Sequence, residues 1–195
     1  MPSSFQIREK RRHCGALALL ILATSASADY REQLNYDYYH VPTKPEQSLF
    51  RAMQQASPIR QHSKTYFGST RWTIDWRMTW QETTRGTCAI TNVQVKLNAT
   101  ILMPRLVGAS TAQQARFVRF ESALKTHELG HYALGQESAK RIQQTIRNMP
   151  EMPDCSSLET AANGRGNRVI EQARAQEIAY DRETNHGMTQ GASIN

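Results

Sequence analysis

Residues Lys125–Ser138 read KTHELGHYALGQES, and this stretch determines how the rest of the chain is interpreted. It contains His127, Glu128 and His131, which form the pattern His-Glu-x-x-His. Two histidines four residues apart on a helix point the same way, so that both imidazoles can bind one zinc ion. The glutamate can reach a water molecule on that ion without being a ligand itself. The stretch therefore predicts a helix that carries a hydrolytic zinc site.

The residues around this pattern predict one long helix. Ser110 to Gln113 offers a capping box, and the helical pattern continues to about Asn148. The two histidines share a face with four apolar residues, Phe117, Phe120, Leu124 and Leu134. Buried imidazoles without partners would cost free energy, which argues against a chance pair on a solvated helix. A structural zinc site is the other alternative, but such sites have four protein ligands and are rich in cysteine.

Residues 1–28 have the features of a secretory signal peptide. Four basic residues precede the apolar run Ala16–Ala23, and small residues at Ala26 and Ala28 suit cleavage after Ala28. The run is too short to span a bilayer. We therefore expect an exported protein, periplasmic or secreted, without a stable membrane anchor after cleavage.

Charge and cysteine content narrow the classes of function. The formal net charge is +7, and removal of residues 1–28 lowers it to +4 because four basic residues and one acidic residue leave. There is no dense basic run beside aromatic residues, so nucleic acid is not an expected partner. Two cysteines, Cys88 and Cys155, remain in the exported chain and favour one disulfide bond, with two unpaired thiols as the alternative.

The first half of the chain predicts strands. Residues 70–80 place three tryptophans, Ile74 and Met78 on one face, and residues 88–101 alternate similarly, with Ile90 out of phase at an expected bulge. A Gly-containing turn makes them an antiparallel hairpin. Residues 36–41 predict a further strand, residues 29–35 are expected to be irregular, and Pro104 is expected to end the second hairpin strand. Residues 46–56 predict a short helix.

A second long helix is expected after Cys155 and should run back towards the histidines. This would bring Glu177, Asp181 and His186 near the zinc site as alternatives for the third ligand. If His186 binds the ion, Asp181 is free to orient a ligand imidazole. Tyr180 could donate to a developing oxyanion. Spacing alone favours ordinary roles for all of them: Glu177 and Asp181 as solvated charges, Tyr180 as a core residue and His186 as a loop residue.

The chain resembles a family of bacterial predicted secreted zinc-dependent proteases, a largely uncharacterised domain. The resemblance rests on the Trp-rich strand 70–80, on Gly86-Thr-Cys88, on the His127–His131 motif and on YDRETNHG at 180–187. It implies an envelope metalloprotease with Zn²⁺. It also favours functional roles for Tyr180, Asp181 and His186, of which His186 is our first choice as third ligand.

These observations predict an α+β fold in which a small antiparallel sheet packs on two long antiparallel helices, as in zincins. Residues 29–195 would form one domain. The expected activity is hydrolysis of peptide bonds in a peptide or protein of the cell envelope, with Glu128 as general base and Tyr180 at the oxyanion. The alternatives are an amidase acting on cell-wall peptide and a non-catalytic envelope module whose metal is structural or vestigial.

Overall fold

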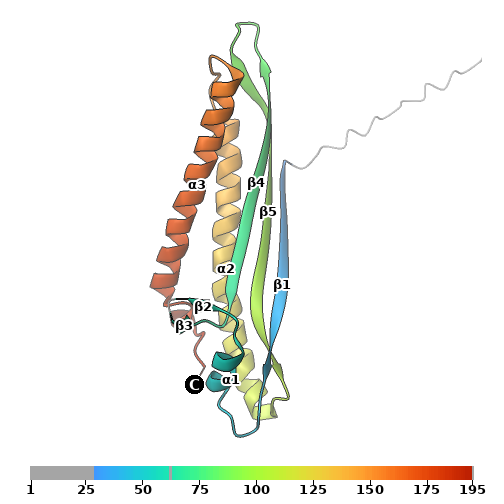
Figure 1. Ribbon diagram of the computed structural model, residues 1–195, viewed down its shortest axis with the longest axis vertical. Coiled ribbons are helices and arrows are strands. Elements are labelled where there is room, and N and C mark those ends of the chain that lie inside the picture. The colour runs from blue at the N-terminus through green and yellow to red at the C-terminus, as the bar shows by residue number, and fades with distance from the viewer. Residues whose placement is uncertain (1–28, 62, 195) are drawn as a thin grey trace, which may run out of the picture.

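A computed structural model describes residues 29–61 and 63–194 (Figure 1). The expected signal peptide lies outside these residues. A sheet faces two long helices that lie side by side along the length of the molecule. No helix within the described ranges is long and apolar enough to cross a bilayer. The α+β class predicted from the sequence is confirmed.

The main sheet has three strands in the order β1–β5–β4. β4 (Ser69–Glu82) and β5 (Cys88–Val107) form the predicted antiparallel hairpin. Their register shifts between Thr79 and Trp80, and Trp80 pairs with Ile90, the residue at which the bulge was expected. β1 (Tyr30–Pro42) lies parallel to β5 along its other edge. The sheet is therefore mixed and not purely antiparallel. The turn between β4 and β5 fixes the direction of that pair alone, so it carried no information about β1.

Two strands are longer than their sequence suggested. The segment 29–35 was expected to be irregular, but β1 begins at Tyr30 because it pairs with the middle of β5 from Val95 onwards. Pro104 was expected to end β5, yet the strand continues to Val107. β4 pairs with β5 only as far as Leu102, so beyond that residue one side of β5 has no strand neighbour. A residue without an N–H is tolerated at such an edge.

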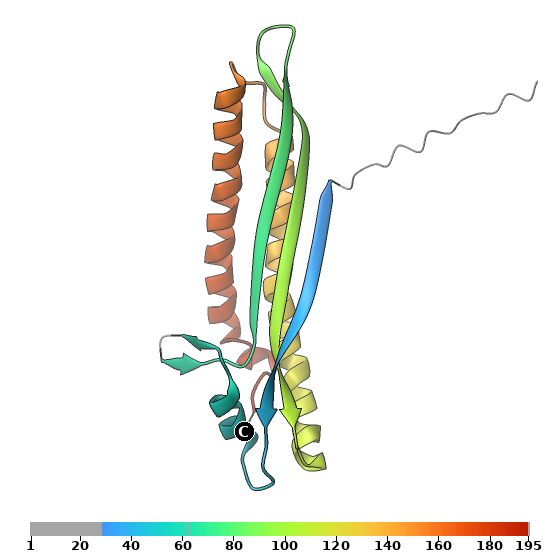
Figure 2. The same ribbon diagram turned by 45° about the vertical axis from the view of Figure 1, so that its right-hand side comes forward.

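Helix α2 (Thr111–Arg147) begins with the predicted capping box, in which Ser110 and Gln113 each bond to the other's backbone N–H. Helix α3 (Cys155–Thr184) begins at the N-cap Asp154 and runs antiparallel to α2 (Figure 2). Glycines allow close approach of tryptophans to both helices. A Cβ at Gly135 would lie 3.1 Å from the Trp72 ring, and one at Gly166 would lie 2.7 Å from the Trp76 ring.

Two clusters of buried apolar residues lie between α2 and the sheet, and Leu129 packs against both. One surrounds α1 (Leu49–Ala56) and includes Val41, Met53, Ile101, Phe117, Phe120, Leu124 and Ile194. The other lies towards the far end of α2 and includes Ile74, Val93, Leu97, Tyr132, Ile142, Ile146 and Val169. The His-Glu-x-x-His segment therefore lies where the two clusters meet.

Three shorter features complete the chain. The strands β2 (Arg60–Gln61) and β3 (Lys64–Thr65) form a small hairpin beside the end of α3 (Figure 1). After α3, the 3₁₀ helix η1 (Met188–Gln190) leads to a tail whose Ile194 is 6% exposed. The predicted disulfide between Cys88 and Cys155 is present, with a Cα–Cα distance of 5.1 Å. It joins the start of β5 to the start of α3.

Candidate metal centre

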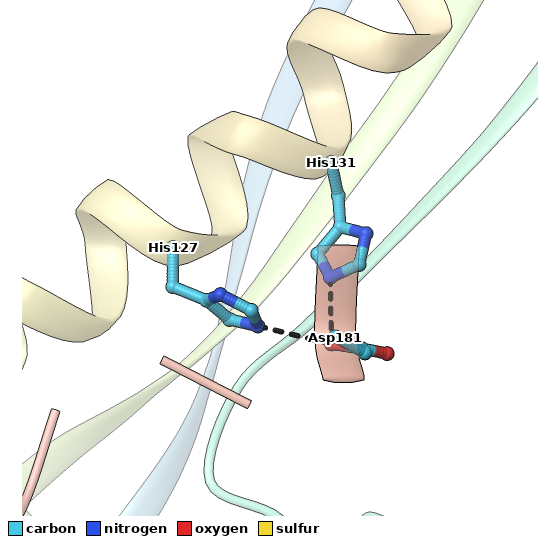
Figure 3. A group of neighbouring side chains, drawn as sticks. All are labelled: His127, His131 and Asp181. Carbon is cyan, nitrogen blue, oxygen red and sulfur yellow. Dashed lines mark hydrogen bonds and ion pairs between the residues drawn. The ribbon is translucent and has the colours of Figure 1, made fainter. Parts of the chain in front are cut away.

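His127 and His131 project from α2 towards Asp181 of α3, as Figure 3 shows. The Nε2 atom of His127 lies 3.2 Å from Asp181 Oδ1, and the Nε2 atom of His131 lies 3.1 Å from the same oxygen. Among the residues that the structure describes, these three form the one group whose candidate ligand atoms lie within 4.8 Å of one another. The antiparallel course of α2 and α3 makes this meeting of residues 50 positions apart possible.

The other ring nitrogen of each histidine faces an acceptor. His127 Nδ1 lies 3.0 Å from the side-chain oxygen of Gln190, which projects from η1. His131 Nδ1 lies 3.4 Å from Glu177 Oε1, and the Trp72 indole N–H donates to that same oxygen at 2.8 Å. An acceptor at Nδ1 places the proton there and leaves the Nε2 lone pair for a metal ion. Both histidines are therefore oriented as metal ligands are.

The pKa values of His131 and Asp181 are shifted by burial and by hydrogen bonds between them. Burial acts to lower the pKa of His131, but hydrogen bonds to the carboxylates of Asp181 and Glu177 outweigh it and raise the pKa to about 9. Burial acts to raise the pKa of Asp181, and hydrogen bonds to His127 and His131 lower it overall. Hydrogen bonding between His131 and Asp181 thus favours the charged form of both groups.

Glu128 is 3% exposed and faces a cavity of about 440 Å³ that His127, His131 and Asp181 also line. Its Oε2 accepts a hydrogen bond of 2.8 Å from Thr70 Oγ1 at the start of β4. Burial raises the pKa of Glu128, while the Thr70 hydrogen bond acts in the opposite direction. A Cβ at Gly68 would lie 2.6 Å from Glu128 Oε1, so a glycine is needed to give this carboxylate room.

The structure places the alternative ligands at different points. Glu177 lies against the far nitrogen of His131, where it orients the ring. His186 is not part of the close group; its Nδ1 lies 3.3 Å from Asp181 Oδ1, and its side chain is 40% exposed. It follows Asn185 in a turn in which both residues have positive φ, 48° and 52°. Asp181 is therefore the one of these three that belongs to the group able to hold a metal ion, and His186 lies beside it.

Tyr180, which was predicted to donate to an oxyanion, contacts His127 in the structure. Its hydroxyl donates to the backbone carbonyl of His127 at 3.2 Å, and its ring stacks on the His127 imidazole at 5.1 Å. A Cβ at Gly130 would overlap this hydroxyl, and Tyr180 is absent from the residues that line the cavity. The geometry assigns it to holding His127 in place.

Four residues at the site were not anticipated from the sequence: Gly68, Thr70, Trp72 and Gln190. The first three lie more than 50 positions before the motif and reach it because β4 packs alongside α2, with Thr70 against Glu128 and Trp72 against Gly135. Gln190 lies in the segment after Asn185 and contacts His127. No local spacing could have indicated these contacts, because each depends on tertiary structure.

Comparisons with known proteins identify a family for most of the chain. A family model described as "Bacterial protein of unknown function (DUF922)" matches residues 36–187. No curated protein and no solved structure matches the chain. The matched region contains both histidines, Glu128, Asp181 and His186, together with the two cysteines. The chain therefore belongs to the DUF922 family of bacterial proteins.

Proposed function

We propose that this protein is an exported zinc-dependent peptidase that hydrolyses peptide bonds in the cell envelope. One observation carries the proposal: two imidazole nitrogens meet one carboxylate oxygen beside a buried glutamate, and all four side chains line one cavity. The resemblance of HELGH and YDRETNHG to predicted secreted zinc proteases supports the same activity.

The donor set fits zinc. Ligand atoms at zinc–ligand distances of 2.0–2.1 Å in a tetrahedron are separated by about 3.3 Å. The nitrogen–oxygen separations of 3.2 and 3.1 Å are close to this value. His127, His131 and Asp181 would hold the ion, and three protein ligands leave a fourth position for water or substrate, as in catalytic zinc sites. The acceptors on Nδ1 supply the outer contacts that such ligands require.

A zinc ion held there would supply Lewis-acid chemistry, polarising the scissile carbonyl and lowering the pKa of a water molecule. Glu128 accepts a proton from the attacking water molecule while the water oxygen forms a bond to the carbonyl carbon. The same carboxyl then delivers that proton to the leaving nitrogen as the carbon–nitrogen bond breaks. Thr70 keeps Glu128 directed at the cavity through its hydrogen bond to Oε2.

Tyr180 is not used as an oxyanion donor in this proposal, because its hydroxyl is engaged by the His127 carbonyl. His186 is better placed, since it lines the cavity and lies next to Asp181. We assign His186 to the developing negative charge on the substrate oxygen. On this assignment, His186→Ala lowers kcat and leaves the zinc content unchanged.

The test compares Glu128→Gln with Glu137→Gln, a matched change on the exposed side of the same helix. Loss of the general base should lower the hydrolysis of an unfolded protein by roughly 10²–10⁴-fold, with about one zinc per chain retained. Glu137→Gln should leave both quantities as in the wild type. Zinc content is measured by atomic emission and hydrolysis by the release of new amines.

Purified cell wall serves as a second substrate in the same assay. Hydrolysis of cell wall without hydrolysis of unfolded protein would replace the peptidase with the cell-wall amidase. If the zinc-loaded wild type hydrolyses neither, the enzyme assignment is wrong and a binding or assembly module remains.

A further inference from the structure

A second cavity, of about 480 Å³, adjoins the one at the candidate metal centre. Both cavities are lined by Tyr66, Phe67, Leu124 and His186, which form the partition between them. The rings of Tyr66 and His186 pack against each other with centroids 4.6 Å apart. Because His186 also contacts Asp181, a single side chain separates the second cavity from the ligand oxygen.

Aromatic and aliphatic side chains line the second cavity together with polar ones such as Gln54 and Lys64, and we call it the phenylalanine cavity after Phe50, Phe67 and Phe120. Phe67 lies edge-on to both Phe50 and Phe120, with centroids 5.9 and 6.0 Å apart. Phe120 and Ile194 are buried, whereas Phe50 and Met188 are 45% and 54% exposed. Apolar side chains left exposed around a cavity of this volume are typical of a site that an apolar group occupies.

The backbone between the two cavities is fixed. The Tyr66 N–H donates to the Ile59 carbonyl at 3.0 Å, and the Phe67 carbonyl accepts from the Tyr39 hydroxyl at 2.9 Å. From Tyr66 to Thr70, consecutive residues lead from the phenylalanine cavity to Glu128. An extended peptide advances about 3.3 Å per residue, so a residue next to the hydrolysed bond can reach the phenylalanine cavity.

We propose that the phenylalanine cavity is a specificity subsite that binds a large apolar side chain, aromatic or aliphatic, of the residue flanking the hydrolysed bond. This inference rests on the proposed peptidase function and adds the class of substrate: peptides with Phe, Leu or a similar residue at that position. Leu124 and His186 place the subsite against the metal centre, and Phe50 and Phe120 provide its apolar walls.

The test measures binding and cleavage separately. Zinc-loaded Glu128→Gln chain is titrated with capped peptides that share a polar sequence and differ at one residue, Phe, Leu or Ala. The Phe and Leu peptides should bind about tenfold more tightly than the Ala peptide, because only they bury a large apolar group. Adding Gln54→Trp, which fills the phenylalanine cavity from α1, should abolish this preference. Gln55→Trp, the neighbouring exposed position of α1, is the control and should keep it.

Equal affinities for the three peptides would overturn the subsite, as would an equal effect of the two tryptophan substitutions. Cleavage of the same peptides by the wild type tests the peptidase proposal independently of the subsite. Hydrolysis of all three peptides at one rate would leave a peptidase without this subsite. Selective binding of Phe and Leu peptides without hydrolysis would support the subsite and contradict the peptidase.

Discussion

The two ends of the α3 helix are held in place by different chemistry. At its start, Cys155 is bonded to Cys88, and the backbones of Cys88 and Met152 exchange hydrogen bonds of 2.8 and 2.9 Å. Near its other end, Asp181 meets three imidazoles within 3.1–3.3 Å. The contacts at the first end are a disulfide bond and backbone hydrogen bonds, and they involve no ionisable side chain. At the second end, hydrogen bonds to the carboxylates of Asp181 and Glu177 raise the pKa of His131 to about 9.

This contrast indicates that the start of α3 stabilises the fold and that its end carries the candidate metal site. The covalent link fixes α3 against the sheet regardless of any ligand, so that the far end can carry groups whose arrangement is costly without an ion. The contact between Gly166 and Trp76, which lies between the two ends, sets how closely α3 approaches β4. The account therefore predicts that changes at the start and middle of α3 alter stability and that changes near its end alter metal binding.

The largest effect on stability is expected from Cys88→Ser with Cys155→Ser. The disulfide joins residues 67 positions apart, and its loss should lower the free energy of unfolding by about 4 kcal/mol. The measurement is urea unfolding of the zinc-loaded protein. Zinc content per folded chain should be unchanged, since the site lies at the opposite end of α3. Loss of zinc from the folded variant would contradict the claim that the two ends of α3 have separate roles.

A smaller effect on stability is expected from Gly166→Ala, with Gly164→Ala as the matched control on the same helix. The added methyl at Gly166 would lie 2.7 Å from the Trp76 ring, whereas at Gly164 it meets only Arg168 at 3.8 Å. Gly166→Ala should destabilise the protein by about 2 kcal/mol through overpacking. Gly164→Ala should stabilise it by about 0.5 kcal/mol, because alanine favours the helix. Thermal unfolding measures both, and equal shifts would show that Trp76 does not limit the approach of α3.

The smallest of these effects concerns Glu177→Gln. The glutamate accepts from the Trp72 indole and faces His131 Nδ1, so the substitution keeps the shape and removes the charge behind the ligand. Zinc affinity should fall about tenfold. Competition with a zinc chelator measures the affinity. Complete loss of zinc would instead identify Glu177 as a ligand.

The sequence predicted those features of the fold that local patterns encode. The hairpin β4–β5 and its bulge, the capping box at Ser110 and the course of α2 all follow from period and caps. The direction of β1 and the passage of β5 through Pro104 depend on which strands are neighbours, and local patterns do not contain that information. The disulfide was predictable because only Cys88 and Cys155 remain after the expected cleavage.

At the site, the motif on α2 identified three residues, and the antiparallel return of α3 narrowed the rest to Glu177, Tyr180, Asp181 and His186. Their separate roles could not be assigned from spacing. Asp181 lies on the last turn of α3, whereas His186 lies beyond the helix in a turn with positive φ. Which of the two side chains reaches the histidines depends on the path of the backbone in that turn, which the spacing of residues does not determine.

The central claim is that His127, His131 and Asp181 bind one zinc ion, and zinc content tests it most directly. Wild type, Asp181→Ala, Glu177→Ala and His186→Ala are purified after export and analysed by atomic emission, with circular dichroism to confirm folding. The account predicts about one zinc per chain in wild type, its loss in Asp181→Ala and its retention in His186→Ala. A folded wild type that takes up no added zinc would contradict the account, as would an Asp181→Ala chain that keeps its zinc.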